Sequence, residues 1–378
     1  MTAPPDGLTL ALTRRLRSTP FTSRIEAAGV RSYTVYNHML LPTQFRGVEQ
    51  DYHHLRDAVQ VWDVSCERQV QLAGPDAARL AQLLTVRDLR TFAVGRCGYA
   101  PVVDHDGLLI NDPVVLRLAD DRFWFSVSDS DVVLWAGGLA QGLGLDVSVG
   151  EPDVWPLAVQ GPRAEDVVAA VFGEQVREIR FFRFAPLQFC GHELVVARSG
   201  WSAQGGFEIY VDDAALGGDL YDALMDAGVQ YDIGPGCPNL IERIEAGLLT
   251  YGTDVTRADT ALEAGLDRYC SLDAPIAAIG IEALRRQATS GVTRRICGMT
   301  IDGDAVTPPR DPWPVHAPGI AVGQVTSAVW SPRLNTNVAI GMLAIEHVRP
   351  GTELAVETTA GARNGTVVEM PFPGASQR

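Results

Sequence analysis

The sequence contains no lysine, so all 31 of its basic residues are arginine. Without a lysine amine the chain cannot form the Schiff base of an ordinary pyridoxal-phosphate enzyme, nor supply the lysine of a Walker phosphate-binding loop. It also lacks an apolar run long enough to span a membrane, and its N-terminal segment lacks the apolar core of a signal peptide. We therefore expect a cytoplasmic protein without a membrane partner.

Several other chemistries lack their motifs. No G-x-G-x-x-G follows a predicted strand, which removes support for a dinucleotide fold, and there is no G-x-S-x-G nucleophile turn. A cobalamin-type D-x-H-x-x-G pattern starts at Asp51 and His53 but has Arg56 in place of the glycine. The six cysteines and seven histidines are scattered without a C-x-x-C pair. We therefore expect buried thiols, no disulfide framework and no metal site.

Composition limits the class of protein. An apolar content of 46% and a charged content of 20% are typical of a soluble globular chain. The net charge of −15 argues against nucleic acid as the main partner, although a local basic pocket for an anion is compatible with it. A length of 378 residues predicts two or three domains.

A repeat indicates how these domains are arranged. Residues 71–84 and 158–172 both read as a strand followed by a Gly-Pro turn and a helix, which predicts two similar α+β halves. From Arg295 onward, short strands separated by proline and glycine predict a small all-β domain. The expected division is a first α+β domain over 1–150, which need not be continuous, a second over 151–290, which contains the loop before Glu208, and a β domain over 291–378. Residues 1–13 are polar, and we expect them to be loose.

The stretch Arg198–Tyr210 reads as a strand end, a loop and a new strand. Period two places Glu208 and Tyr210 on one face of the new strand. A carboxylate between large apolar neighbours is costly unless it is paired. The competing interpretation is an outward, solvated Glu208 on a half-exposed sheet.

Asp112 presents a similar choice. Asp104 and Asp106 are explained as turn formers, but Asp112 lies past the turn and inside the predicted second strand of a hairpin over 95–112. It could instead cap a bulge near Pro113. Together with Glu208, Tyr210, Trp201 and Tyr36, Asp112 makes a set of isolated carboxylates and aromatics. This set favours a site that binds an organic cofactor by hydrogen bonds and stacking.

Longer motifs resemble the tetrahydrofolate-binding aminomethyltransferase family, which includes the T-protein of the glycine cleavage system. The stretches that carry the resemblance are 69–77, 104–112, 157–162, 200–210, 243–255, 261–266 and 322–341. They extend over nearly the whole chain. The resemblance implies an α+β fold with three domains in a ring around a central folate channel, and a small C-terminal β-barrel.

Four stretches are similar to the dimethylsulfoniopropionate demethylase branch of that family: 17–42, 59–70, 198–211 and 234–252. Trp201–Gly206 replaces the loop of ordinary T-proteins, which favours a methyl donor other than a lipoyl-bound aminomethyl group. Gly98 stands where the branch usually carries a bulkier, aromatic residue. If Gly98 faces the pocket, the donor could be a different onium compound.

The resemblance also implies roles for residues. Glu208 matches the glutamate that binds the pterin, Asp112 the aspartate near the reactive nitrogens, and Tyr210 a tyrosine of the folate pocket. We expect Asp112 to be catalytic, Trp201 to line the cofactor and donor sites, and Tyr36 and Tyr99 to contact the donor.

The expected reaction is transfer of a methyl group from dimethylsulfoniopropionate to N5 of tetrahydrofolate. One alternative is a tetrahydrofolate-dependent demethylase of another N-methyl or O-methyl donor. Another is a non-catalytic folate-binding relative, like those of iron-sulfur assembly, although Cys237 and Cys270 do not match their reactive cysteine motif. The expected partners are folate and a small methyl donor, and a homodimer is compatible with the sequence.

Overall fold

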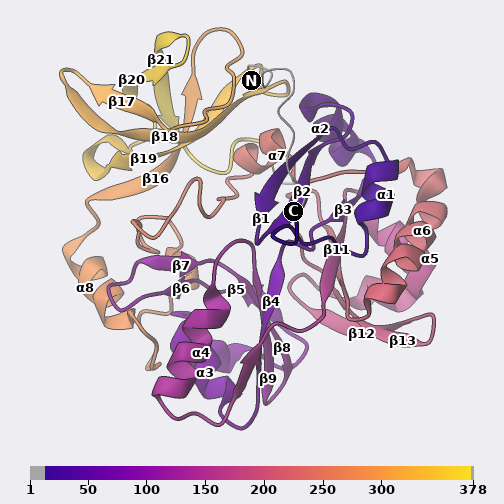
Figure 1. Ribbon diagram of the computed structural model, residues 1–378. Helices are drawn as coiled ribbons and strands as arrows, with labels where there is room; N and C mark the ends of the chain where they lie inside the picture. The colour runs from indigo at the N-terminus through magenta and orange to yellow at the C-terminus, as the bar shows by residue number, and fades with distance from the viewer. Residues whose placement is uncertain (1–12, 376–378) are drawn as a thin grey trace.

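The computed structural model describes residues 13–375 and places them in three lobes that meet around a short central helix (Figure 1). This helix, α7, spans Leu240–Glu245. Two lobes are antiparallel or mixed sheets covered by helices, and the third is a closed barrel. Most of residues 1–13, expected to be loose, lie outside the described part of the chain.

The first sheet has five antiparallel strands in the order β10-β4-β9-β8-β5. Their bounds are Ser148–Gly150 (β10), Arg68–Ala73 (β4), Arg122–Val127 (β9), Val114–Ala119 (β8) and Cys97–Tyr99 (β5). Helices α3 (Ala77–Leu84) and α4 (Val132–Gly142) pack against it. In α3 the buried Leu80, Ala81 and Leu84 form the apolar face expected of an amphipathic helix.

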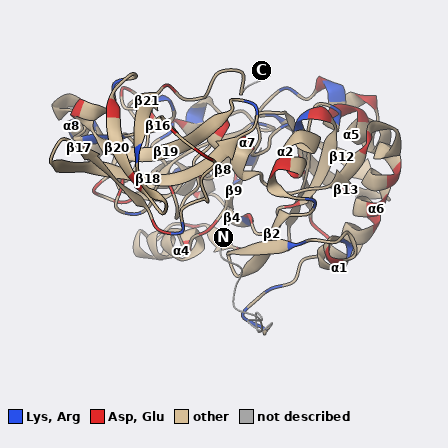
Figure 2. Cartoon of the chain, turned by 90° about the horizontal axis from the view of Figure 1, so that it is seen from above, with Lys and Arg blue, Asp and Glu red and all other residues tan. Residues whose placement is uncertain are grey.

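The second sheet has six strands in the order β12-β13-β14-β11-β3-β15. Their bounds are Phe184–Phe189 (β12), His192–Ala197 (β13), Gly206–Val211 (β14), Trp155–Gln160 (β11), Val59–Asp63 (β3) and Ile233–Pro235 (β15). Helices α5 (Ala164–Phe172), α6 (Gly217–Gly228) and α1 (Thr22–Ala27) contribute to its core. Acidic residues lie on the outer surface of this lobe, for example along α6 (Figure 2).

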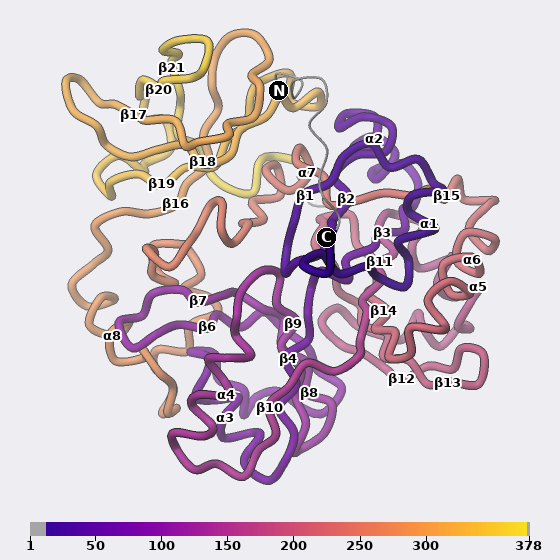
Figure 3. The backbone as a smooth tube through the Cα atoms, in the orientation of Figure 1, coloured from indigo at the N-terminus to yellow at the C-terminus, as the bar shows by residue number. Residues whose placement is uncertain are grey.

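The predicted repeat is present as a shared strand order. In the first sheet β4, α3, β5, β8 and β9 follow one another, and β9 returns to pair with β4. In the second sheet β11, α5, β12, β13 and β14 follow the same course, and β14 pairs with β11. The first half also supplies β3, which lies between β11 and β15 in the second sheet (Figure 3). We keep the division at 150 and 290 as a proposal, with β3 assigned to the second unit.

The C-terminal lobe is a closed six-stranded barrel in the order β16-β19-β18-β17-β20-β21. Its strands are Arg294–Ile301 (β16), Thr336–Ala344 (β19), Ile320–Ser331 (β18), Trp313–Ala317 (β17), Glu353–Thr358 (β20) and Gly361–Val368 (β21). Its apolar interior includes Met299, Val315 and Val356. Closure leaves no unpaired edge, so a small β domain is stable here.

Two hairpins and two more helices connect the lobes. They are β1 (Ser32–Tyr36) with β2 (Met39–Gln44), β6 (Val102–Val103) with β7 (Leu109–Asn111), α2 (Val48–Asp57) and α8 (Ile281–Ser290). Short 3-10 turns span Leu89–Thr91, Glu174–Glu178, Ala214–Leu216, Val229–Tyr231, Asp267–Tyr269 and Ile345–His347. No helix of residues 13–375 is long and apolar enough to cross a bilayer.

Candidate active site

The face of β14 that carries Glu208 is buried, and the alternative of a solvated surface glutamate is wrong. Glu208 is 5% exposed and lies in register with Ala158 on β11 and Ala197 on β13. These small neighbours leave room for the carboxylate. Tyr210 shares its face, as period two predicted, because its hydroxyl donates to Glu208 Oε2 over 3.3 Å.

Within the part of the chain that the structure describes, Glu208 receives two hydroxyl donors and forms no ion pair. Ser199 Oγ donates a short hydrogen bond to the same oxygen, Oε2, which leaves Oε1 for a ligand. Burial raises the pKa of Glu208, and the Ser199 and Tyr210 hydroxyls oppose the rise. Tyr210 in turn packs against Trp124 of the first sheet, with ring centroids 5.8 Å apart. The two sheets therefore meet at Glu208.

Asp112 lies at a break in what the sequence predicts as the second strand of the hairpin. The chain leaves β7 after Asn111, turns at Asp112 and Pro113, and starts β8 at Val114 in a different sheet. The predicted bulge cap is therefore not the arrangement found. Tyr99 donates a short hydrogen bond from its hydroxyl to Asp112 Oδ2. Burial raises the pKa of Asp112 to about 7, and the Tyr99 hydroxyl limits the rise.

Tyr36 and Trp201 are placed less directly. Tyr36 is half-buried at the end of β1 and packs on the cluster that includes Trp62 and Cys66. Burial raises its pKa to about 12. Trp201 is half-buried at the start of the loop before β14. Within the described chain, no hydrogen bond or ring contact joins Trp201 or Tyr36 to Glu208 or Asp112, so their roles as donor walls stay predictions.

Gly98 faces away from the Tyr99 side chain. Successive side chains of β5 alternate, so Cys97 and Tyr99 lie on one face and Gly98 on the other. A Cβ on Gly98 would lie 2.8 Å from Cζ of Phe92, which is itself 1% exposed in the core of the first lobe. Phe92 thus fills the space that a larger residue at 98 would need.

The loop between β13 and β14 is held from both sides. Ser202 Oγ donates to Gln160 Oε1 over 2.7 Å, and the Ala203 amide donates to Glu242 Oε1 on α7 over 2.5 Å. Burial raises the pKa of Glu242 to about 7, and the Ala203 amide opposes the rise. At Gly206, with φ of 151°, a Cβ would lie 2.2 Å from the Val159 carbonyl oxygen, so the loop enters β14 only through glycine.

Sequence reasoning missed Glu67, Ser126, Ser199 and Glu242. Glu67 follows the buried β3 and precedes β4, where a charged residue reads as an ordinary turn. Ser126 Oγ donates to Glu67 Oε2 over 3.4 Å from the neighbouring β9. No spacing rule reveals such partners, because they come from elements far apart in the chain.

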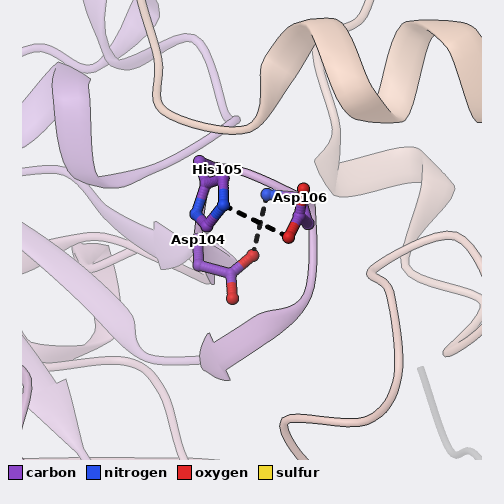
Figure 4. Close-up of side chains that lie close together, drawn as sticks. All are labelled: Asp104, His105 and Asp106. Carbon is purple, nitrogen blue, oxygen red and sulfur yellow. Dashed lines mark hydrogen bonds and ion pairs between the residues drawn. The ribbon is translucent and has the colours of Figure 1, made fainter.

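Three residues whose side chains could bind a metal ion lie together in a turn. Asp104, His105 and Asp106 lie together between β6 and β7 (Figure 4). Asp104 Oδ1 accepts the amides of Asp106 over 3.0 Å and Leu108 over 3.1 Å, which confirms the predicted role in the turn. His105 and Asp106 are exposed, and we assign no ion to them. All six cysteines are free thiols, and four are buried.

Two strand-repeat halves, a closed barrel, the buried Glu208 and the half-buried Asp112 define an aminomethyltransferase-type fold. The chain belongs to the glycine cleavage T-protein family. Residues 21–274 match the GCVT N-terminal domain, and residues 294–373 match the glycine cleavage T-protein C-terminal barrel domain.

Relatives and a solved structure agree with this family. The chain is 53% identical over 356 residues to the dimethylsulfoniopropionate demethylase DmdA of Ruegeria pomeroyi, covering 94% of this chain and 97% of that protein. It is 31% identical to an aminomethyltransferase of Symbiobacterium thermophilum, over 88% of this chain and 91% of the relative. The crystal structure of aminomethyltransferase T from Bartonella henselae superposes with a TM-score of 0.85 at 23% identity, covering 96% and 99% of the two chains. The predicted family and fold class are thereby confirmed.

The residues present suit tetrahydrofolate, the cosubstrate on which this family depends. A pterin offers amino and ring N–H donors, and the site offers acceptors, namely Glu208 and Asp112. Asn111 beside Asp112 is fully buried with both side-chain polar atoms unpartnered. Buried polar atoms without partners are rare unless a ligand or water completes them.

Proposed function

We propose that this protein is a tetrahydrofolate-dependent demethylase that moves a methyl group from dimethylsulfoniopropionate to N5 of tetrahydrofolate, giving methylthiopropionate and 5-methyltetrahydrofolate. The observation that carries the proposal is the 53% identity to the Ruegeria pomeroyi demethylase over 94% of the chain. Glu208 and Asp112, with which no arginine or histidine of residues 13–375 forms an ion pair, suit a positively charged donor.

Bound tetrahydrofolate supplies the nucleophilic N5, whose lone pair forms the new bond to the methyl carbon. The carbon–sulfur bond breaks with both electrons going to sulfur, and the proton displaced from N5 leaves. The sulfonium is already a good leaving group, so the protein mainly aligns and desolvates the reactants.

The named side chains divide this work. Glu208 accepts hydrogen bonds from pterin donors and fixes their orientation. Asp112, with a pKa raised to about 7, is suited to hold the released proton near neutral pH. Trp201 and Tyr36 offer aromatic faces to the sulfonium, each worth about 0.5–2 kcal/mol. Tyr210 and Tyr99 hold the two carboxylates in place.

The direct test is incubation of purified protein with tetrahydrofolate and dimethylsulfoniopropionate, with methylthiopropionate measured by mass spectrometry. Formation of the thioether in step with 5-methyltetrahydrofolate is expected. Turnover of an N-methyl or O-methyl donor instead would change the donor assignment. Folate binding without turnover of any donor would favour a non-catalytic relative.

The finer partner assignments stay proposals. We propose a cytoplasmic protein without a nucleic-acid or membrane partner, and a homodimer as its assembly. Light scattering after size-exclusion chromatography tests the dimer, because one chain of 378 residues has a mass of 40.7 kDa.

A further inference from the structure

Glu67 is a third carboxylate at the meeting point of the two sheets. Its Oε2 accepts from Ser126 Oγ over 3.4 Å, and Ser126 Oγ accepts from Gln69 Nε2 over 3.0 Å. Ser126 also influences the Tyr210 hydroxyl, which donates to Glu208. Glu67 on the first lobe therefore lies near the Tyr210–Glu208 pair on the second.

Positive charge is missing around this group. Among residues 13–375, no arginine or histidine forms an ion pair with Glu67, Glu208 or Asp112. Some buried carboxylates elsewhere do have such partners: Asp254 pairs with Arg243 over 2.7 Å and Glu245 with Arg333 over 2.8 Å.

The surroundings of Glu67 add acceptors and no cation. Arg68, its neighbour in sequence, turns away to pair with Glu151. Gln69, which is 1% exposed, has an Oε1 atom without a donor. A buried acceptor of this kind is a second sign that a group from outside the described chain completes the site.

The three carboxylates are close enough to affect one another. Burial raises the pKa of Glu67 well above its ordinary range, and the charges of Glu208 and then Asp112 raise it further. Glu67 therefore lies near both the residue assigned to the pterin and the residue assigned near N5. A methyl donor must occupy that region if its methyl carbon is to meet N5.

We propose that Glu67 recognises the positive charge of the methyl donor and so makes the site selective for a cationic onium donor over a neutral one. This inference rests on the proposed function. A sulfonium has no N–H to donate, so a protein recognises its charge most strongly through aromatic faces and carboxylates. Glu208 and Asp112 are engaged by the folate in the proposed reaction, and Glu67, with one long hydrogen bond, is the carboxylate left for the donor.

The test compares two ligands of one shape and different charge. Dimethylsulfoniopropionate and 4-methylpentanoate have the same branched skeleton and carboxylate, but a neutral carbon replaces the sulfonium in the second. Calorimetric titration without folate gives the ratio of their dissociation constants. We expect the wild-type protein to prefer the sulfonium by about tenfold or more, and Glu67→Gln to reduce the preference below about threefold.

Variants separate charge from structure. Glu193→Gln, at an exposed position of β13, should keep the wild-type preference. Glu67→Asp, which keeps the charge on a shorter side chain, should restore part of it. If Glu67→Gln does not fold, as judged by circular dichroism, Glu67→Met of similar length carries the same expectation.

The outcomes are distinct. An unchanged preference in folded Glu67→Gln, or equal binding of both ligands by the wild-type protein, would overturn the inference. The titration requires no turnover. A protein that prefers the sulfonium through Glu67 but forms no thioether would therefore overturn the proposed reaction and leave the charge recognition standing.

Discussion

At the scale of single residues, the pair of Asp112 and Tyr99 controls when a proton can be accepted. Asp112 accepts only when ionised, and burial raises its pKa to about 7. We therefore expect kcat/KM of the wild-type protein to rise as the pH increases through about 7 and then level off. Asp112→Asn should remove this rise and lower kcat by about 100-fold. Measured pH profiles from both proteins, with circular dichroism to verify folding, test the expectation.

The hydroxyl of Tyr99 should tune that profile. It donates to Asp112 and so favours the ionised carboxylate. Tyr99→Phe should therefore move the acid limb to higher pH by about 0.5–1 unit, since a net hydrogen bond of about 1 kcal/mol corresponds to somewhat less than one unit. Tyr269→Phe is the matched control, because the Tyr269 ring lies 4.7 Å from that of Tyr99. A limb that stays in place or moves down would contradict the assignment.

The same carboxyl group should affect stability before any ligand binds. The pKa of Asp112 is raised from 3.8 to about 7 on folding, so between these values the native state holds more protons than the unfolded state. The free energy of unfolding should then fall as the pH rises from about 4 to about 7. Asp112→Asn removes this cost. The free energy of unfolding of Asp112→Asn, relative to that of the wild type, should therefore be about 1–4 kcal/mol higher at about pH 8 than at about pH 4. Urea unfolding of both proteins at both pH values measures this change. The same difference in unfolding free energy between variant and wild type at both pH values would contradict the expectation.

What the sequence could predict at this scale follows from the chemistry of single positions. Glu208 and Asp112 were predicted because a carboxylate within an apolar strand is costly unless something pairs with it, and because the family motifs contain both residues. Glu67 and Glu242 were missed because they lie in a turn and on a helix, where charge is ordinary. Their importance arises only from the packing of β4 on β9 and of α7 under the loop.

At the scale of elements, the loop over 199–206 depends on Glu242. Glu242 Oε1 accepts the Ala203 amide, so Glu242→Ala should leave that buried amide unsatisfied and cost about 1–3 kcal/mol. The loop should also become more mobile, which hydrogen exchange at 201–206 measures alongside urea unfolding. Glu178→Ala, at an exposed position, should change neither. Unaltered exchange in folded Glu242→Ala would show that Gln160 alone holds the loop.

The elements themselves were largely predictable, but not their partners. Apolar periodicity predicts helices over 48–58, up to residue 84 and over 131–143, close to α2, α3 and α4, because this periodicity is local. The pattern over 59–72 predicts two strands around one turn, yet β3 and β4 lie in different sheets. In the barrel, the apolar patterns predict β16, β18, β19 and β20 but not β17 and β21, since proline, glycine and polar residues interrupt the last two.

At the scale of the whole molecule, contacts of α7 join the barrel to the sheet lobes. Arg243 pairs with Asp254 and donates to Ser327 of β18 over 2.6 Å. Arg243→Met should leave Asp254 buried without a cation and cost about 3–5 kcal/mol in urea unfolding. Arg310→Met, at an exposed barrel position, is the control and should cost less than about 0.5 kcal/mol. A cost for Arg243→Met no larger than for the control would contradict a fastening role.

The position of β3 has a consequence for synthesis on the ribosome. The first sheet has all its strands once residue 150 has emerged, but β3 then still waits for β11 at 155–160 and for β15 at 233–235. Until then a strand that is fully buried in the folded protein has two open edges, which is the condition under which nascent chains associate wrongly. A fragment that stops at residue 150 should therefore aggregate, while a fragment that starts at residue 151 should lack the strand that joins β11 to β15. The two α+β halves resemble each other in strand order, but neither half completes its folding alone.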